Sequence, residues 1–267
     1  MLELQKVQQS FRRSLRTYNE HAFVQLEIAQ TLAKLLFDFS AKQQFDRVFE
    51  IGCGTGFFTK ALLNKFKVQE LHLNDLVGEC EMVLSEELQQ YSALQLKDWS
   101  FSAEDVNQLN LVERFDLICA ASSLQWVENL PLLINKIIAH LSPQAFLAFS
   151  SFTSEHFHEL QIINQQLGSA VQKLNYVSKS QWHELLDEQF ELLSLEEQKI
   201  TLWFDSVEDL LRHLRYTGVN GNSGQQWGQK HLQDFVKIYN AEFSNDGRFP
   251  LTYTPIFIVA RCRKQYG

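Results

Sequence analysis

A glycine-rich turn flanked by two acidic residues is the feature of this sequence with the clearest chemical meaning. Gly52, Gly54 and Gly56 follow a short β-prone run that ends with Glu50 and one isoleucine, and a helix is predicted directly after them. Glycine lets the backbone leave a strand in a tight turn and approach a ligand closely. Asp75 ends the next predicted strand, 21 residues after Gly54. A carboxylate at that place can accept both hydroxyls of a ribose.

The charge around this turn separates the ligands that it can bind. Glu50 and Asp75 repel a pyrophosphate, and the pattern is GxGxG, whereas dinucleotide folds carry GxGxxG. The Lys-Ser/Thr pair of a nucleoside triphosphate loop is also missing. S-adenosylmethionine carries an ammonium, a sulfonium and a ribose, which suit two carboxylates. We therefore expect this methyl donor to bind here, the alternative being a tight turn without a ligand.

Further donor contacts are expected from the loops that follow the other strands. Glu104 or Asp105 can accept the adenine amino group while Val106 offers its backbone amide, although a solvated loop is the alternative for these acids. Leu76 is expected to pack on the adenine. The complete expected donor set is Glu50, Gly52, Gly54, Thr55, Gly56, Asp75, Leu76, Glu104, Asp105, Val106, Ala121 and Ser122.

The elements that must position these residues alternate between strand and helix. Strands are predicted over 47–51, 68–75, 99–101, 115–121 and 145–149, and helices over 57–66, 79–91 and 130–141. Such alternation predicts a parallel sheet with helices on both faces, which binds ligands at the carboxyl ends of its strands. After residue 150, helices are predicted over 156–167, 180–187, 206–216 and 226–240, and the last strands of the sheet over 190–195, 200–204 and 255–263.

We therefore expect a doubly wound α/β fold of the Rossmann-like class, with a mostly parallel seven-stranded sheet. No linker rich in Pro, Gly or Ser divides the chain, so residues 1–267 are interpreted as one domain. Its expected parts are an N-terminal helical segment (1–40), a donor-binding core (41–150) and the remaining strands with inserted helices (151–267). The N-terminal helix and the inserted helices are expected to form a lid.

Apolar spacing over residues 10–36 predicts the amphipathic N-terminal helix. Thr17 and Glu20 fit a capping box, so we expect a break just before Thr17.

The composition excludes several classes of protein. With 45% hydrophobic and 21% charged residues, the 267-residue chain is not expected to be disordered. No apolar run approaches the length of a membrane span, and the first residues lack the apolar region of a signal peptide. A net charge of −8 argues against bulk nucleic-acid binding. The four cysteines show no metal-type spacing, so we expect no metal and a cytoplasmic location.

Residues 50–56 (EIGCGTG) and 71–75 (LHLND) resemble the first two motifs of the class I S-adenosylmethionine-dependent methyltransferases. Residues 11–25, 200–205, 211–218 and 247–253, and the triplet Leu124-Gln125-Trp126, are similar to one family within that class, the malonyl-acyl-carrier-protein O-methyltransferases of biotin synthesis. Together these stretches cover nearly the whole chain. The glycine motif is common to many methyltransferases, whereas the other stretches are far more discriminating.

The resemblance implies methyl transfer from S-adenosylmethionine to the free carboxylate of a malonyl thioester. The resulting methyl ester starts pimeloyl and biotin synthesis. The carboxylate, with a pKa of roughly 4, is ionised at neutral pH and needs no general base. Orientation and a dry site are expected to supply most of the acceleration. The malonyl group is carried by acyl carrier protein or by coenzyme A, and the sequence leaves that choice open.

Acceptor contacts are expected from the N-terminal helix and the region after the fourth strand. Tyr18 and His21, three residues apart, can donate hydrogen bonds to the reacting carboxylate or the thioester carbonyl, with Gln25 one turn further on. The alternative is that Tyr18 is a core aromatic and His21 faces solvent. Trp126 is expected to form the pocket wall near the methyl group.

Arginines supply two further expectations. Arg212 and Arg215, three apart in the predicted helix 206–216, are candidates to hold the malonyl carboxylate, or they are solvated.

The cluster of Arg12, Arg13 and Arg16 is a candidate docking patch for the acidic carrier protein, or simply a solvated helix end.

Two other functions remain open at this stage. One is a C-methyltransferase that acts on quinone precursors, which needs a base. The other is a catalytically silent donor-binding subunit of another protein. We also expect a monomer that binds neither nucleic acid nor a membrane.

Overall fold

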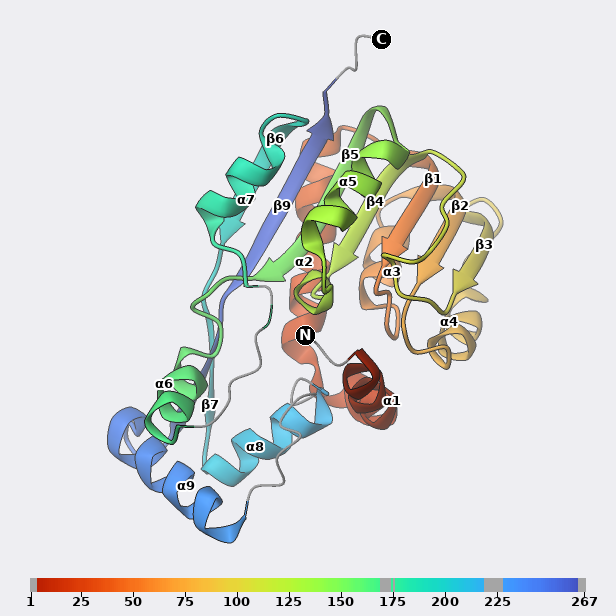
Figure 1. Ribbon diagram of the computed structural model, residues 1–267. Coiled ribbons are helices and arrows are strands. Elements are labelled where there is room, and N and C mark those ends of the chain that lie inside the picture. The colour runs from red at the N-terminus through yellow and green to blue at the C-terminus, as the bar shows by residue number, and fades with distance from the viewer. Residues whose placement is uncertain (1–3, 169–173, 175, 219–227, 264–267) are drawn as a thin grey trace.

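The computed structural model describes residues 4–168, 174, 176–218 and 228–263, and Figure 1 shows its arrangement. Seven strands form one sheet in the order β3-β2-β1-β4-β5-β9-β6. They are β1 (Gln44–Ile51), β2 (Lys67–Asn74), β3 (Leu96–Ser102), β4 (Phe115–Ala121), β5 (Leu141–Phe152), β6 (Phe190–Glu197) and β9 (Pro255–Cys262). Strands β1 to β5 pair in parallel, while β9 runs antiparallel to both β5 and β6. The expected mostly parallel seven-stranded sheet is confirmed.

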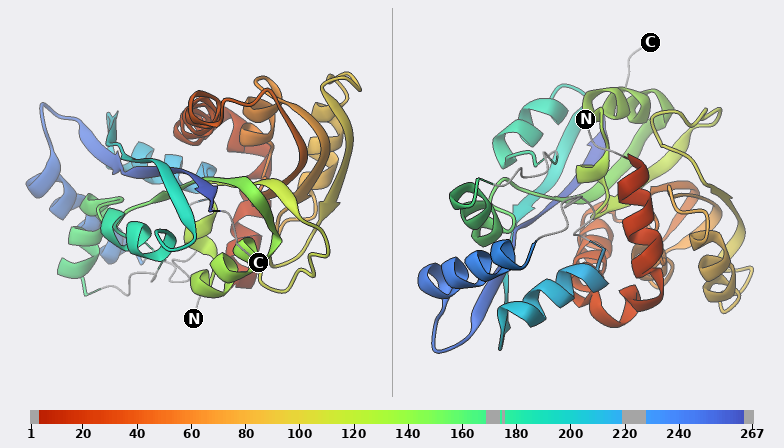
Figure 2. Two further views of the ribbon diagram at one scale, coloured as in Figure 1. Left: turned by 90° about the horizontal axis from the view of Figure 1, so that it is seen from above. Right: turned by 60° about the horizontal axis from the view of Figure 1, so that its bottom comes forward.

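Helices cover both faces of this sheet, as the edge-on view in Figure 2 shows. One face carries α2 (Phe23–Ser40), α3 (Phe57–Leu63) and α4 (Cys80–Leu88), and the other carries α5 (Leu130–His140) and α7 (Lys179–Leu186). Each face has its own apolar core because side chains alternate along a strand. In β1, Val48 belongs to the first core and Phe49 to the second, and both are at most 2% exposed.

A separate two-stranded sheet is formed by β7 (Ile200–Phe204) and β8 (Phe249–Tyr253). The expectation that residues 200–204 belong to the main sheet is therefore wrong. These residues do form a strand, but they pair in antiparallel register with β8, from Ile200 opposite Tyr253 to Phe204 opposite Phe249. Strand propensity specifies an extended segment without specifying its partner.

The small sheet is surrounded by the helices that are inserted between the later strands. These are α6 (His158–Gln166), α8 (Val207–Tyr216) and α9 (Gln229–Phe243). The start of the predicted helix 226–240 lies outside the described residues, and the described part of it extends to residue 243.

The N-terminal segment folds as two helices, but the break is not where the sequence predicted it. Helix α1 runs from Leu4 to His21 and α2 starts at Phe23. The expected capping box is absent, because the Thr17 hydroxyl donates to the carbonyl of Ser14 and to that of Tyr216 at the end of α8. A long-range contact with α8 thus replaces the cap, and Thr17 stays inside the helix.

Helix α1 lies beyond the carboxyl ends of β1 and β2 and beside the end of α8 (Figures 1 and 2). It therefore lies over the strand ends at which the sequence predicts a ligand site, and its role as part of a lid stays a prediction. Within the described ranges, no helix combines the length and the apolar character that a bilayer span requires.

Candidate active site

A cavity that opens to solvent lies at the carboxyl ends of the central strands, beneath α1, and its space including the open part is about 1120 Å³. Of the twelve residues that the sequence assigned to the donor, all but Gly56 line it. Tyr18, Gln25 and Trp126 from the expected acceptor set also line it. The sheet therefore brings together residues from six separate segments of the chain at the edge where an α/β fold binds its ligands.

The three glycines of the turn after β1 leave no room for larger residues at Gly52 and Gly56, whereas Gly54 faces open space. Gly52 has φ +68°, and a Cβ built on it would lie 2.4 Å from the Cβ of Ser123. Gly54 also has a positive φ, +53°, but no described atom lies within 4 Å of its ideal Cβ position. Since Gly54 lines the cavity, a side chain there would occupy ligand space. Gly56 packs behind the turn, against Leu84, which is why it does not reach the cavity.

Asp75 is held in place by two backbone amides. Its Oδ2 accepts a hydrogen bond of 2.9 Å from the amide of Gly54, and its Oδ1 accepts one of 2.8 Å from the amide of Val77. Burial raises the pKa of Asp75, and the two backbone bonds oppose that rise. Each carboxylate oxygen keeps a further lone pair, so both can accept a ribose hydroxyl.

Glu50 is the most deeply buried acid of the cavity, with 1% exposure. Its Oε2 accepts a hydrogen bond of 2.7 Å from the hydroxyl of Thr59 on α3. Burial raises the pKa of Glu50 to about 8, and the nearby charge of Asp75 adds to the rise. A cation that enters the cavity beside Glu50 would favour its ionised form. The site is therefore suited to a positively charged ligand.

Three buried polar atoms of the cavity lining have no hydrogen-bond partner within the described part of the chain. They are Gln25 Oε1, Thr55 Oγ1 and Ser122 Oγ. A buried polar atom that remains unsatisfied costs roughly 1–3 kcal/mol. A polar ligand would satisfy these atoms, and the open space at Gly54 leaves room for it. The lining thus fits a donor with an ammonium, a carboxylate and a ribose.

The expected adenine loop is fixed by a lysine that the sequence reasoning missed. The Nζ of Lys136 on α5 donates to the carbonyls of Val106, Asn107 and Leu109 at 2.7–2.9 Å. The Oδ1 of Asp105 accepts the amide of Asn107 at 3.0 Å, which tightens the same turn. No sequence signal pointed to Lys136, because about thirty residues separate it from the loop that it holds.

Helix α1 supplies much of the cavity wall. It begins at Leu4, whereas the sequence predicted that the helix would begin at residue 10. Leu4, Val7, Gln8, Phe11 and Leu15 line the cavity in addition to Tyr18. Their spacing of three and four residues places them on one face of the helix. The Nε2 of Gln8 donates to the carbonyl of Leu76, which ties α1 to the loop after β2. Asn74, Cys53 and Phe57 are further lining residues that were not predicted.

The aromatic side chains on the acceptor side of the cavity are held by contacts with other rings. The ring of Tyr18 lies 5.6 Å from that of Phe57, and Trp126 meets Phe11 edge-on at 5.3 Å. Burial raises the pKa of Tyr18, so its hydroxyl is neutral near pH 7. Tyr18 therefore combines a fixed ring with a hydroxyl at the cavity wall.

Three residues expected to contact the acceptor lie outside the cavity wall. His21 stacks on Tyr216 of α8, with ring centroids 4.4 Å apart. Arg212 forms an ion pair with Asp209 at the surface, and Arg215 is exposed. The reason is the face of α8 that packs inward: Leu210, His213 and Leu214 are buried, which turns the two arginines outward.

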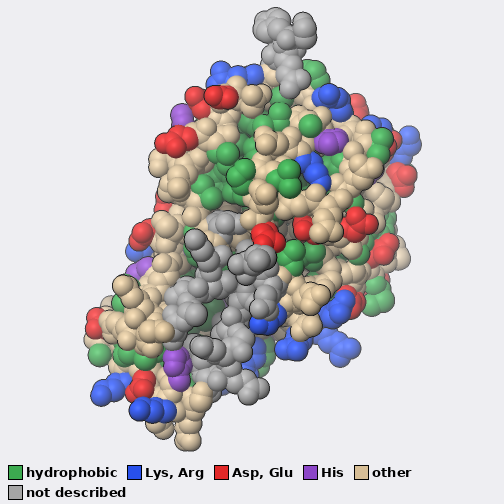
Figure 3. Space-filling view, viewed as in Figure 1, with side chains coloured by type: hydrophobic (Ala, Val, Ile, Leu, Met, Phe, Trp, Pro, Cys, Tyr) green, Lys and Arg blue, Asp and Glu red, His purple; other side chains and the backbone are tan. Residues whose placement is uncertain are grey.

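The arginines of α1 face solvent. Arg13 and Arg16 are exposed, and Arg12 forms an ion pair of 2.7 Å with Glu79. Figure 3 shows Lys and Arg side chains around this helix. The outer side of α1 is thus basic although the chain as a whole carries a net charge of −8.

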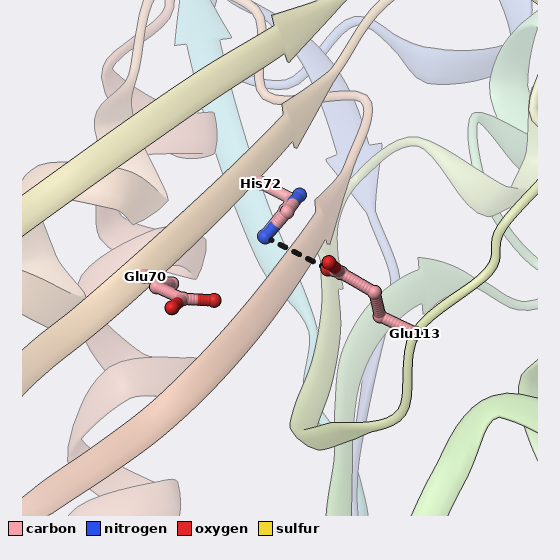
Figure 4. Close-up of side chains that lie close together, drawn as sticks. All are labelled: Glu70, His72 and Glu113. Atoms are coloured by element: carbon pink, nitrogen blue, oxygen red, sulfur yellow. Dashed lines mark ion pairs between the residues drawn. The ribbon is translucent and has the colours of Figure 1, made fainter.

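Away from the cavity, the structure brings Glu70, His72 and Glu113 together (Figure 4). The Nε2 of His72 lies 3.4 Å from Glu113 Oε2. The Nε of Arg47 lies 2.7 Å from Glu70 and 3.7 Å from Glu113. Because a guanidinium already lies beside both carboxylates, we interpret this cluster as a network of surface ion pairs.

Comparison with known proteins identifies methyltransferases as relatives of this chain. The family described as "Methyltransferase domain" matches residues 18–195. The malonyl-acyl-carrier-protein O-methyltransferase of Chlorobium phaeovibrioides is 34% identical over 97% of this chain and 96% of its own. The protein of the same name from Acinetobacter baylyi is also 34% identical, over 96% and 95% of the two chains.

Among solved structures, the N-methyltransferase NodS from Bradyrhizobium japonicum in complex with S-adenosyl-L-homocysteine superposes with a TM-score of 0.54. The match covers 96% of this chain and 98% of NodS. At 17% identity, this likeness shows the shared fold alone.

Proposed function

Because this chain belongs to the malonyl-acyl-carrier-protein O-methyltransferase family, within the class I S-adenosylmethionine-dependent methyltransferases, we propose that it methylates the free carboxylate of a malonyl thioester. The donor is S-adenosylmethionine, and the product is the methyl ester that starts pimeloyl and biotin synthesis. The carrier is acyl carrier protein, with coenzyme A as the alternative. The observation that carries this proposal is the pair of acids, buried Glu50 and half-buried Asp75, on either side of Gly54 in the cavity.

Donor binding follows from the geometry of the cavity. Asp75 offers both carboxylate oxygens to the ribose, since its backbone bonds leave lone pairs free. Glu50 faces the ammonium, and Thr55 and Ser122 can bond the polar end of the donor through their unsatisfied hydroxyls. The loop that Lys136 holds receives the adenine. When bound, S-adenosylmethionine supplies an electrophilic methyl group on a sulfonium.

The side chains that line the other half of the cavity favour a carboxylate as the methyl acceptor. The described lining contains no lysine, arginine or histidine, and Tyr18 and Gln25 offer neutral polar groups. A carboxylate nucleophile is already ionised and needs no base. Its charge is neutralised during the transfer, so apolar walls such as Phe11 and Trp126 assist by excluding water. Methylation at carbon needs a base, for which this lining offers no histidine or lysine.

Carrier docking is proposed on the outer side of α1. The same helix forms the cavity wall with Phe11 and Tyr18 and carries Arg13 and Arg16 on its exposed side. An acidic carrier protein that binds these arginines would deliver its malonyl arm next to the cavity. Electrostatic complementarity of this kind mainly raises the rate of encounter.

We further propose that the protein works as a monomer in the cytoplasm, without nucleic acid or membrane. All four cysteines are buried and unpaired, as is usual in a reducing compartment.

The proposed function is tested by incubating purified protein with methyl-labelled S-adenosylmethionine and one acceptor at a time. The acceptors are malonyl-acyl carrier protein, malonyl-coenzyme A and a quinone precursor. Label on a malonyl thioester supports the proposal and identifies the carrier. Label on the quinone precursor alone supports a C-methyltransferase, and donor binding without any transfer supports a catalytically silent subunit.

A further inference from the structure

A row of buried polar groups lies behind the acceptor side of the cavity. Gln25 on α2 lines the cavity and is 7% exposed, and its Oε1 has no partner among the described residues. Tyr253 of β8 is fully buried, and the Gln25 side chain donates a hydrogen bond to its hydroxyl. On its other side, the Tyr253 hydroxyl lies 2.7 Å from Nε2 of His213 on α8. Three elements thus meet at one line of hydrogen-bonding groups that ends at the cavity.

Both inner members of this row are neutral. Burial lowers the pKa of His213 to about 4, and burial also raises the pKa of Tyr253. A neutral imidazole carries one proton. If that proton is on Nε2, His213 donates to the Tyr253 oxygen, and the Tyr253 O–H is then free to donate to Gln25.

The orientation of the Gln25 amide sets the direction of the chain. The two orientations of a side-chain amide differ by a half-turn and are assigned from the hydrogen bonds that they make. In the structure the amide nitrogen faces Tyr253, and turning the amide over gives the buried Oε1 a donor in the Tyr253 hydroxyl. It also leaves the amide nitrogen, with two N–H donors, on the cavity side.

We propose that His213 and Tyr253 are positioning residues that hold the Gln25 amide with its N–H groups towards the cavity, where they bind the carboxylate of the acceptor. This inference rests on the proposed function. A neutral amide orients the carboxylate without neutralising it, whereas a guanidinium would reduce its nucleophilicity. Tyr18, also at the cavity wall, supplies a second neutral donor. The absence of cationic side chains from the described lining is thus part of the specificity for a carboxylate nucleophile.

The decisive variant is Tyr253→Phe, with Tyr239→Phe as its matched control. Tyr239 is equally buried and donates to the carbonyl of Pro250 on β8, but it does not line the cavity or contact Gln25. We expect Tyr253→Phe to raise KM for malonyl-acyl carrier protein about tenfold, the effect of losing one oriented hydrogen bond. The Kd for S-adenosylmethionine, measured by calorimetry, should stay within about twofold. Equal acceptor KM values for the two variants would overturn the proposal.

A double-mutant cycle separates a connected chain from two independent packing effects. We expect His213→Leu to raise acceptor KM like Tyr253→Phe, and His213→Gln, which keeps a donor, to raise it less. The double variant should be no worse than Tyr253→Phe alone, because both substitutions break the same chain. Additive losses would contradict the inference.

The imidazole tautomer gives a readout that does not depend on activity. In ¹⁵N spectra of the intact protein we expect the His213 proton on Nε2, and a proton on Nδ1 would overturn the chain. If the parent binds donor but does not methylate a malonyl thioester, the proposed function itself is wrong. If the parent is active and Tyr253→Phe leaves acceptor KM unchanged, only the further inference fails.

Discussion

The backbone amide of Gly54 donates a 2.9 Å hydrogen bond to Oδ2 of Asp75. This bond joins the turn after β1 to the residue that follows β2, so the two segments that we propose bind the donor are fixed relative to each other before any ligand enters. The carboxylate is therefore oriented in advance, and the donor need not order it on binding. Preorganisation of this kind lowers the free-energy cost of association.

A methyl group at Gly54 should block the donor without unfolding the protein. Gly54→Ala places a Cβ in the cavity and strains a residue with φ +53°. Gly247 is the matched control, since it has φ +74° and equally open surroundings but does not line the cavity. Thermal unfolding should show that each variant loses about 1 kcal/mol of stability. Calorimetry should show at least tenfold weaker S-adenosylmethionine binding for Gly54→Ala alone; similar binding by both variants would contradict this geometry.

Glu50 should couple donor binding to proton release. Its pKa of about 8 keeps it protonated at pH 7, and the donor's ammonium favours the ionised form. Calorimetry at pH 7 in buffers of different ionisation enthalpy should therefore report proton release, which is lost in Glu50→Gln. A buffer-independent enthalpy at pH 7 would show that the ammonium does not bind beside Glu50.

The Glu50 carboxyl group also makes the stability of the folded protein depend on pH. Because the folded-state pKa of Glu50 lies above its ordinary value of 4.5, its contribution to stability is complete below pH 4.5 and is lost as pH rises through about 8. In chemical denaturation without donor, the stability of Glu50→Gln relative to the parent should increase as the pH rises from 4.5 to about 8. A constant difference across that range would contradict the raised pKa.

Lys136 should act on the donor through the loop that it holds. Lys136→Met removes three hydrogen bonds to loop carbonyls, and we expect about tenfold weaker donor binding and a stability loss of about 1–3 kcal/mol. Lys34→Met, which breaks only an exposed ion pair with Asp38, is the control and should change neither quantity. Unaltered donor affinity in Lys136→Met would mean that the adenine lies elsewhere.

The basic side of α1 should matter for the carrier and not for the malonyl group. Arg13→Glu combined with Arg16→Glu should raise KM for malonyl-acyl carrier protein about tenfold and weaken its dependence on salt. KM for malonyl-pantetheine, which lacks the carrier protein, should not change. If both acceptors are affected alike, the arginines do not form the docking surface.

The main sheet could be predicted from the sequence because its signals are local. Strand, glycine turn and helix follow one another from β1 to α3, and the positions of Glu50 and Asp75 at strand ends place them at one edge of a parallel sheet. The small sheet could not be predicted in the same way. Strand β8 contains Pro250 and lies directly before β9, and no strand was predicted over its residues, so the partner of β7 was missed.

The parts of the site that sequence reasoning missed depend on contacts between distant segments. The Thr17 hydroxyl bonds a carbonyl 199 residues away, which no capping rule contains. Arg212 looked like a carboxylate ligand because of its type and position, but the packing of His213 and Leu214 turns it outward. The row from Gln25 to His213 joins three elements and has no pattern in the sequence.

The most direct measurement is the mass of malonyl-acyl carrier protein after incubation with S-adenosylmethionine and either the parent protein or Asp75→Ala. The account predicts that the parent adds the mass of one methyl group, and that Asp75→Ala does so only at greatly raised donor concentration. An unmodified acceptor with the folded, donor-binding parent would contradict it, as would equal donor requirements of the two proteins.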